Sequence, residues 1–148
     1  MPTAEAVQRW ERETITTEKW PTQTCADQEL EAEIKHAAAI LKLTDNWDGE
    51  GSPGYKADTL KRAVWFLTSH AERLCSKYGV RLPVPKIGPG PNGSIDIHWK
   101  SPWELLINIP ADPNEMASFY GDNYGSQKIR GSFDLKTFNL GPFTWLMH

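Results

Sequence analysis

Three side chains that could perform acid–base or metal chemistry lie close together in the second half of the chain. We expect Trp99 to pair with Trp103 across a β-hairpin. His98 would then face Glu104, and Asp96 would point to the same side. One imidazole beside two carboxylates could bind a metal ion or serve as general acid and base. The competing interpretation is the polar, solvent-facing side of a sheet, and it is favoured because no second His or Cys ligand accompanies this site.

The stretch 45-DNWDGEGSPGY-55 is the second candidate, because it combines carboxylates with glycines. A calcium-binding EF-hand needs oxygen ligands at its first, third and fifth positions, Gly at the sixth and Glu at the twelfth. Placing Asp48 and Gly49 at the fifth and sixth positions puts Thr44 at the first and Tyr55 at the twelfth. Both are wrong ligands, so the EF-hand is excluded.

A structural corner is the simpler interpretation of this loop. Asn and Asp bond to nearby backbone N–H groups in turns, and glycine permits positive φ. We expect Trp47 to plug into the core, so that Trp47→Ala loosens the domain whereas Glu50→Ala is nearly silent. Contact with a ligand, or a loose metal site, stays an alternative; it would use Asp45, Asp48 and Glu50. The predicted structural motif comprises Asn46, Trp47, Asp48, Gly49 and Gly51.

Signals for nucleophilic or cofactor chemistry are poor. The chain has no Gly-x-Ser-x-Gly, no Walker lysine loop and no dinucleotide-binding fingerprint. The segment 88-GPGPNG-93 contains glycines, but its prolines remove N–H donors that a phosphate would need. Cys25 and Cys75 indicate neither a disulfide framework nor a zinc site, and we expect Cys75 to be a buried thiol. No cofactor is predicted, and no metal.

Length and composition favour one soluble domain. The chain has 148 residues, 39% of them hydrophobic, and a net charge of −3, which gives no global argument for nucleic acid or an anionic membrane. Acidic residues concentrate in the first third and basic residues in the middle third, as expected for an acidic helix beside a basic one. No apolar run reaches the length of a membrane span. We therefore expect a cytoplasmic protein with reduced cysteines.

Two amphipathic helices are predicted in the first half. Residues 1–23 form an N-terminal arm whose Trp10 and Trp20 could dock on a partner. Residues 25–43 have an apolar stripe at helical spacing, preceded by the capping-box pattern 24-TCAD-27. Residues 57–78 have a second stripe and end before Gly79. The first stripe is Leu30, Ile34, Ala37 and Leu41, and the second is Leu60, Val64, Leu67, Ala71, Leu74 and Tyr78.

Strand patterns follow after residue 93. The segment 81–93 contains four prolines and three glycines, which is typical of a linker or an irregular edge segment. The predicted strands are 94–99, 103–109, 116–121 and 127–135. Because helices and strands are segregated, we predict an α+β fold with two N-terminal helices packed on a four-stranded antiparallel meander sheet in two layers. Residues 24–148 form this single domain.

The loop and the hairpin carry a resemblance. The string Asn46-Trp47-Asp48-Gly49-Glu50-Gly51-Ser52, a following helix, Pro83 and Pro85, 92-NGSIDIHW-99 and 104-ELLINI-109 resemble a group of small bacterial and phage-type proteins. In that group an Asn-Trp-Asp-Gly-x-Gly motif precedes a helix and a Gly-Ile-rich hairpin that ends in Trp. The resemblance covers roughly residues 40–135. It supports the fold and implies no catalysis.

Binding of another protein is the function that these observations favour. Catalytic motifs are absent, aromatic residues are plentiful, and Trp10, Trp20, Tyr120 and Tyr124 are the candidate contacts. The resemblance makes a phage-type modulator of a host or defence system one version, and homo-oligomerisation through the arm or a sheet edge another. A metal-assisted hydrolase using Asp96, His98 and Glu104 is the enzymatic alternative.

Nucleic-acid binding is the remaining alternative. The second predicted helix and its flanks are basic, and aromatic residues could stack on bases. A solvated helix face explains the same residues more simply, given the overall acidity of the chain. The basic residues are Lys56, Lys61, Arg62, Arg73, Lys77, Arg81 and Lys86.

Overall fold

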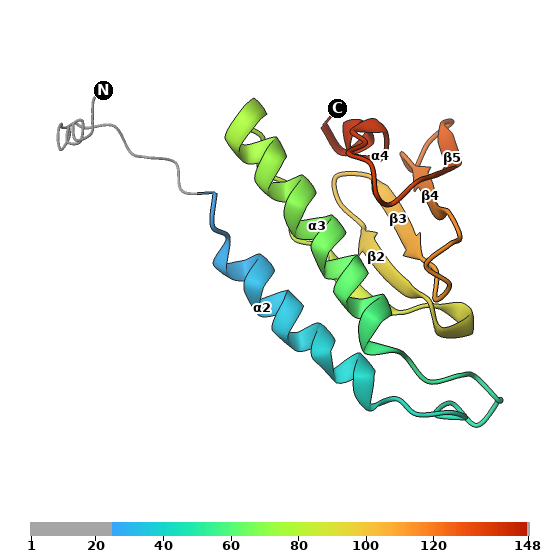
Figure 1. Ribbon diagram of the computed structural model, residues 1–148. Helices are drawn as coiled ribbons and strands as arrows, with labels where there is room; N and C mark the ends of the chain where they lie inside the picture. The colour runs from blue at the N-terminus through green and yellow to red at the C-terminus, as the bar shows by residue number, and fades with distance from the viewer. Residues whose placement is uncertain (1–24, 148) are drawn as a thin grey trace, which may run out of the picture.

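The described part of the chain, residues 25–147 of a computed structural model, is an α+β fold with helices layered on an antiparallel sheet (Figure 1). The predicted arm, with Trp10 and Trp20, lies outside the described residues. Among the described residues there are three α-helices and one five-stranded sheet. The predicted fold class is therefore confirmed, while the predicted strand number was one too few.

Helix α2 (Gln28–Ala37) begins three residues later than the predicted start at residue 25. Asp27 is the N-cap, and its Oδ1 accepts the N–H groups of Glu29 and Leu30 at 3.0 and 3.1 Å. The helix tightens into the 3₁₀ helix η2 (Ala38–Lys42). Leu41, the last residue of the predicted stripe, is 38% exposed there.

Helix α3 (Ala57–Tyr78) has the predicted bounds. It ends because Gly79 adopts a left-handed conformation (φ 67°) and donates its N–H to Cys75 O at 3.0 Å. The buried face is wider than the predicted stripe and shifted from it. Tyr78, assigned to the stripe, is 50% exposed, whereas five residues outside the stripe are buried: Thr59, Ala63, Phe66, His70 and Cys75.

The sheet is an antiparallel meander in the order β1-β2-β3-β4-β5. Its strands are β1 (Lys86–Pro89), β2 (Ile95–Trp99), β3 (Glu104–Ile109), β4 (Ala117–Asp122) and β5 (Lys128–Phe133). Strand β1 lies in the segment predicted as a linker or irregular edge, so the edge interpretation was the correct one. The 3₁₀ turn η3 (Pro91–Gly93) connects it to β2.

The predicted hairpin register was wrong by two residues. Trp99 pairs with Leu105, not with Trp103, and His98 lies opposite Leu106. A shift by two residues keeps every side chain on its predicted face, because side chains alternate along a strand. The apolar pattern therefore could not distinguish the two registers.

The core lies between α3 and one face of the sheet, and α2 lies on the same side of the sheet as α3 (Figure 1). On β2 and β3, six side chains that face α3 are at most 2% exposed: Ile95, Ile97, Trp99, Leu105, Ile107 and Ile109. The C-terminal helices α4 (Gly141–Thr144) and η4 (Trp145–Met147) close this core, with Phe143 packed against Phe66 and Trp99. Within residues 25–147, no helix has the length and apolar character needed to cross a bilayer.

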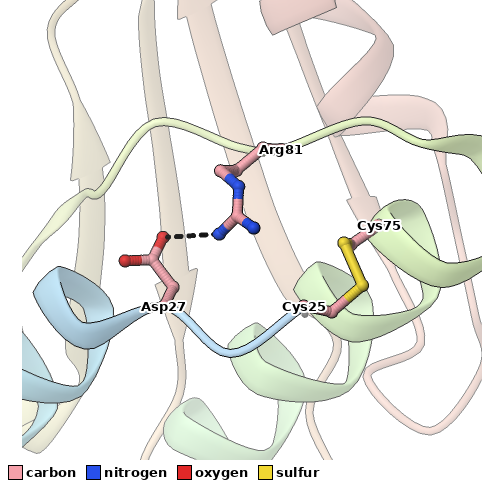
Figure 2. Close-up of a disulfide and its surroundings, with 4 residues drawn as sticks. All are labelled: Cys25, Asp27, Cys75 and Arg81. Atoms are coloured by element: carbon pink, nitrogen blue, oxygen red, sulfur yellow. Dashed lines mark ion pairs between the residues drawn. A yellow bond between two sulfur atoms is a disulfide. The ribbon is translucent and has the colours of Figure 1, made fainter. Parts of the chain in front are cut away.

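A disulfide joins the two long helices, so the prediction of free thiols was wrong. Cys25, just before α2, is bonded to Cys75 in α3, with Cα atoms 5.7 Å apart (Figure 2). Arg81, in the segment after α3, forms an ion pair with Asp27 at 3.8 Å beside this bond. The two cysteines are separated by 50 residues in the sequence, and only the antiparallel packing of α2 against α3 brings them together.

Candidate functional site

The loop of residues 45–55 is a self-bonded corner, as its turn chemistry predicted. Asn46 and Asp48 accept backbone N–H groups from Gly51 and Glu50 at 2.7 and 2.9 Å. Gly49 and Gly51 have φ angles of 76° and 84°, and Asn46 also has positive φ. The hydroxyl of Ser52, followed by the N–H of Glu50, holds the pKa of Asp48 below its ordinary value. These oxygens are occupied by the loop itself.

Trp47 is not the predicted plug of the core. Its side chain is 39% exposed, and its nearest aromatic neighbour is Tyr55, with ring centroids 6.1 Å apart. Tyr55 is the residue that ties the corner to the sheet, because its hydroxyl donates to Gly90 O at 2.7 Å. We therefore expect Trp47→Ala to cost little stability, contrary to the expectation from the sequence.

Asp96, His98 and Glu104 do share the open face of the sheet, but they form two separate pairs. His98 Nε2 lies 2.8 Å from Glu104 Oε2, and Asn108 donates to Asp96 Oδ1 at 2.8 Å. Burial raises the pKa of the Asp96 carboxyl, against the opposing effects of Asn108 and His98. Within residues 25–147 no three His, Cys, Asp or Glu side chains form a group that could hold a metal ion. The geometry therefore gives the metal-assisted hydrolase no support.

Two of the basic residues around α3 help to hold the fold together. Arg62 pairs with Asp58 and donates to two backbone carbonyls after β3, those of Pro110 and Ala111, at 3.1 Å. Arg73 lies over the ring of Phe138, 4.4 Å from its centroid. A guanidinium that bridges elements of the fold is less available to phosphates, so the nucleic-acid alternative depends on the exposed Lys56, Lys61 and Lys77.

The two predicted partner-binding tyrosines within the described residues lie on the β4–β5 hairpin. Tyr120 is on the open face of β4, directly opposite Arg130. Tyr124 is in the turn, is 60% exposed, and donates its hydroxyl to Lys100 O. The structure thus brings Tyr120 and Tyr124 to the β5 side of the sheet, beside an edge strand.

An apolar groove of about 210 Å³ lies between α2, α3 and residues 81–85. Leu30 and Ile34 line one wall, Ala71 the other, and Cys25 one part of its rim. Among the described residues none fills it. The groove adds an exposed apolar surface, and its lining also includes polar side chains: Asp27, Glu31, Thr68, Glu72 and Arg81.

The outer edge of β1 is closed to further strand pairing. Along an antiparallel strand, the backbone N–H and C=O groups of successive residues point alternately toward and away from the neighbouring strand. Those of Ile87 point away from β2, and so do those of Pro85 and Pro89, two residues to either side. The N–H of Ile87 donates to Glu33 Oε2 of α2 at 2.9 Å. Proline has no N–H at all. No outward donor of β1 therefore remains for another strand.

The outer edge of β5 is open. The Asn123 N–H donates to Gln127 O at 3.2 Å, so residues 123 and 127 form a hydrogen-bonded pair of the β4–β5 ladder. Hydrogen-bonded and non-bonded pairs alternate along an antiparallel ladder, and this bond therefore fixes which residues of 128–133 bond to β4. The backbone of Lys128, Arg130 and Ser132 accordingly points away from β4. Within residues 25–147 these three outward N–H groups have no hydrogen-bond partner. An unpaired row of this kind is a template for an additional strand.

Two cations accompany this open edge. Lys128 and Arg130 are exposed on the same face of β5, and no acidic side chain of residues 25–147 forms an ion pair with either. On β1, by contrast, Lys86 lies 4.0 Å from Glu33. Within residues 25–147, the β5 edge thus has unpartnered backbone donors and two cations that form no ion pair, with Asp122 of β4 opposite Lys128 in the register.

Comparisons of the chain with protein-family models, with curated proteins and with solved structures each find no match. The resemblance to small bacterial and phage-type proteins accordingly stays a prediction. Any functional proposal must rest on the geometry of the described residues.

Sequence reasoning did not identify Lys128, Arg130 and Ser132 as site residues. Their pattern was visible, since polar residues alternate with Ile129, Gly131 and Phe133 in the last predicted strand. The predicted meander already placed this strand last and therefore at an edge, but the pattern could not show that its outward N–H groups have no partner within residues 25–147. Glu33, which closes the other edge, gave no sequence signal beyond its place on a helix.

Proposed function

We propose that this protein is a non-enzymatic binding protein that takes an extended segment of another protein as an additional strand on β5. The observation that carries the proposal is the row of N–H groups at Lys128, Arg130 and Ser132 that find no partner among residues 25–147. Binding by strand addition gains main-chain hydrogen bonds on such a row, and side-chain contacts then select the partner. The exposed Tyr124 at the end of the hairpin offers an adjacent aromatic contact.

Self-association through β5 is less favourable than binding a different protein. In an antiparallel pair of two β5 strands centred on Arg130, that residue would lie directly opposite its own copy. Like charges directly opposite each other destabilise a sheet. A modulator of a host or defence system, as the resemblance suggests, is one form that the proposed binding could take.

The compartment is part of the proposal. A location in the cytoplasm was expected from the sequence, but disulfides persist mainly in oxidising compartments. The Cys25–Cys75 bond therefore favours a partner met in an oxidising environment. Cysteine labelling of the protein isolated from its native cells, with and without reductant, tests this part directly.

Affinity capture with three baits tests the strand addition. Ser132→Pro removes one outward N–H and leaves the β4 ladder intact, because residue 132 does not bond to β4. Ser132→Ala is the matched control, since it changes the side chain and keeps the N–H. We expect the wild type and Ser132→Ala to recover the same protein and Ser132→Pro to lose it.

Hydrogen exchange on the recovered complex completes the test. The amides of Lys128, Arg130 and Ser132 should exchange more slowly in the complex than in the free protein. Equal recovery by Ser132→Pro, with a thermal unfolding curve that shows it folded and no added protection of these amides, would overturn the proposal.

A further inference from the structure

The two cations on the open edge define the chemistry of the segment that β5 accepts. We infer that this segment has acidic residues at alternate positions, with apolar residues between them. The inference rests on the proposed strand addition and names the partner's composition.

The acidic positions follow from the register of the open edge. If the added strand runs antiparallel to β5, a residue that exchanges hydrogen bonds with the outward backbone of Lys128 or Arg130 lies directly opposite it and on the same face of the sheet. Both side chains are exposed on the open face and form no ion pair within residues 25–147, although Asp122 of β4 lies opposite Lys128 in the register. Glu or Asp at two positions separated by one residue would therefore meet both cations at once.

The apolar positions follow from the opposite face of β5. Ile129 is half-buried and Phe133 is buried on the side that faces the helices. Between them Gly131 leaves room for the ring of Phe119, since a Cβ at Gly131 would lie 2.8 Å from two of its carbons. This row is apolar and ends at the open edge. Apolar side chains on the incoming strand would extend it and would be removed from water.

Edge lysines also serve to prevent strand pairing, and this role is compatible with the inference. Positive charge at an edge repels a second basic strand and so suppresses indiscriminate association. The same charge attracts an acidic strand, so one arrangement provides both selection and exclusion. A chain with alternating acidic residues is the class of segment that this edge does not repel.

Three synthetic peptides of eight residues separate the parts of the inference: alternating Glu–Val, alternating Lys–Val and alternating Glu–Ser. Each is titrated into the full-length oxidised protein, and both affinity and the exchange of the Lys128, Arg130 and Ser132 amides are measured. We expect Glu–Val to bind at least roughly tenfold more tightly than Lys–Val, because two cross-strand charge pairs become repulsive in the latter. Glu–Ser should bind more weakly than Glu–Val.

The outcomes distinguish failure of the inference from failure of the proposed function. Protection of the three amides by Glu–Val and Lys–Val alike would overturn the acidic chemistry and leave strand addition standing. Absence of protection by every peptide would overturn both. Equal affinity for Glu–Val and Glu–Ser would overturn the apolar part alone.

Two variants provide the matched control. Lys128→Gln combined with Arg130→Gln should abolish the preference for Glu–Val over Lys–Val, whereas Lys77→Gln, an exposed change on α3, should leave it unchanged. The preference should also shrink as salt is added, because exposed charges are screened. A preference that survives the double substitution would overturn the assignment to these two cations.

Discussion

The two edges of the same sheet are treated in opposite ways. On β1 the outward donors have been removed, two by proline and one by the carboxylate of Glu33. On β5 the outward N–H groups of three successive alternate residues have no partner within residues 25–147. The β1 edge is shielded by helix α2, while the β5 edge is exposed and basic. Different residues therefore close the β1 edge and leave the β5 edge exposed, and each edge can be altered by substitution without changing the other.

The disulfide should produce the largest effect, because it fixes α2 beside the β1 edge. Replacing both Cys25 and Cys75 by Ser removes a link across 50 residues, and loop-closure entropy predicts a loss of about 4 kcal/mol in the free energy of unfolding. Urea unfolding measures the loss. Native-state hydrogen exchange should show faster exchange at Ile87 and unchanged exchange along β5; equal changes at both edges would break the comparison.

The next largest difference should be between the losses in the free energy of unfolding when one apolar side chain on each edge strand is truncated. Ile87 on β1 is 7% exposed, so Ile87→Ala should cost about 2–4 kcal/mol. Ile129 on β5 is only half-buried, so Ile129→Ala should cost about 1 kcal/mol. Guanidinium unfolding of the two variants measures both values, and a larger loss at Ile129 would contradict the assignment of β5 as the exposed edge.

Glu33 tests how the β1 edge is closed. Glu33→Ala leaves the Ile87 N–H without its acceptor and should cost about 1–2 kcal/mol. Glu33→Gln retains an oxygen acceptor and should cost less. Lys86→Gln is the control for the ion pair, which is 79% exposed on the lysine side and should contribute under about 0.5 kcal/mol. If Lys86→Gln cost as much as Glu33→Ala, the carboxylate would act through the lysine rather than through the backbone.

The smallest effect is expected from acid, which should weaken the packing of the C-terminal cover, residues 139–146, on the core. His70 accepts the Asn139 N–H at Nε2 (3.1 Å) while Nδ1 lies 2.9 Å from Phe66 O, an arrangement that only neutral imidazole satisfies. Burial, the main cause, lowers the pKa of His70 below 6.5. The unfolded chain therefore binds this proton more readily, and stability should fall as the pH decreases below about 6.5.

Hydrogen exchange across this pH range tests the prediction from His70. Amides of residues 139–146 should lose protection as acid is added, while the Ile87 amide should not. Protection that is independent of pH between 7 and 5 would mean that His70 does not gate the C-terminal cover. A His70→Gln variant should have a flatter stability profile across the same range.

Several features of the fold and of the candidate site were readable from the sequence for local physical reasons. Helix α3 was predicted with its observed bounds because an apolar stripe and Gly79 mark it. The turns of residues 45–55 were predicted because Asn, Asp and Gly act on adjacent backbone. The pairing of His98 with Glu104 was also expected, although the register placing them was wrong.

The errors have a common cause, since each depends on neighbours that are distant in the sequence. Trp47 was expected in the core because Trp is large and apolar, but Tyr55 is the residue that anchors the corner, and Trp47 stays 39% exposed. The thiols were expected to be free because their spacing resembles no motif, yet two antiparallel helices bring them together. The segment with β1 was ambiguous because its prolines suit a linker as well as an edge.

The sequence by itself determined the two long helices, the strands β2 to β5 and which face of β2 and β3 is apolar, because periodicity and turn chemistry act over a few residues. Only the tertiary structure decided that Glu33 reaches Ile87, that Cys25 meets Cys75, and that β5 lies at an open edge. Hydrogen bonds between strands and helices join residues far apart in the chain, and local pattern does not encode their pairing. The proposed function therefore rests on the arrangement of backbone donors at an edge, and no short motif in the sequence shows it.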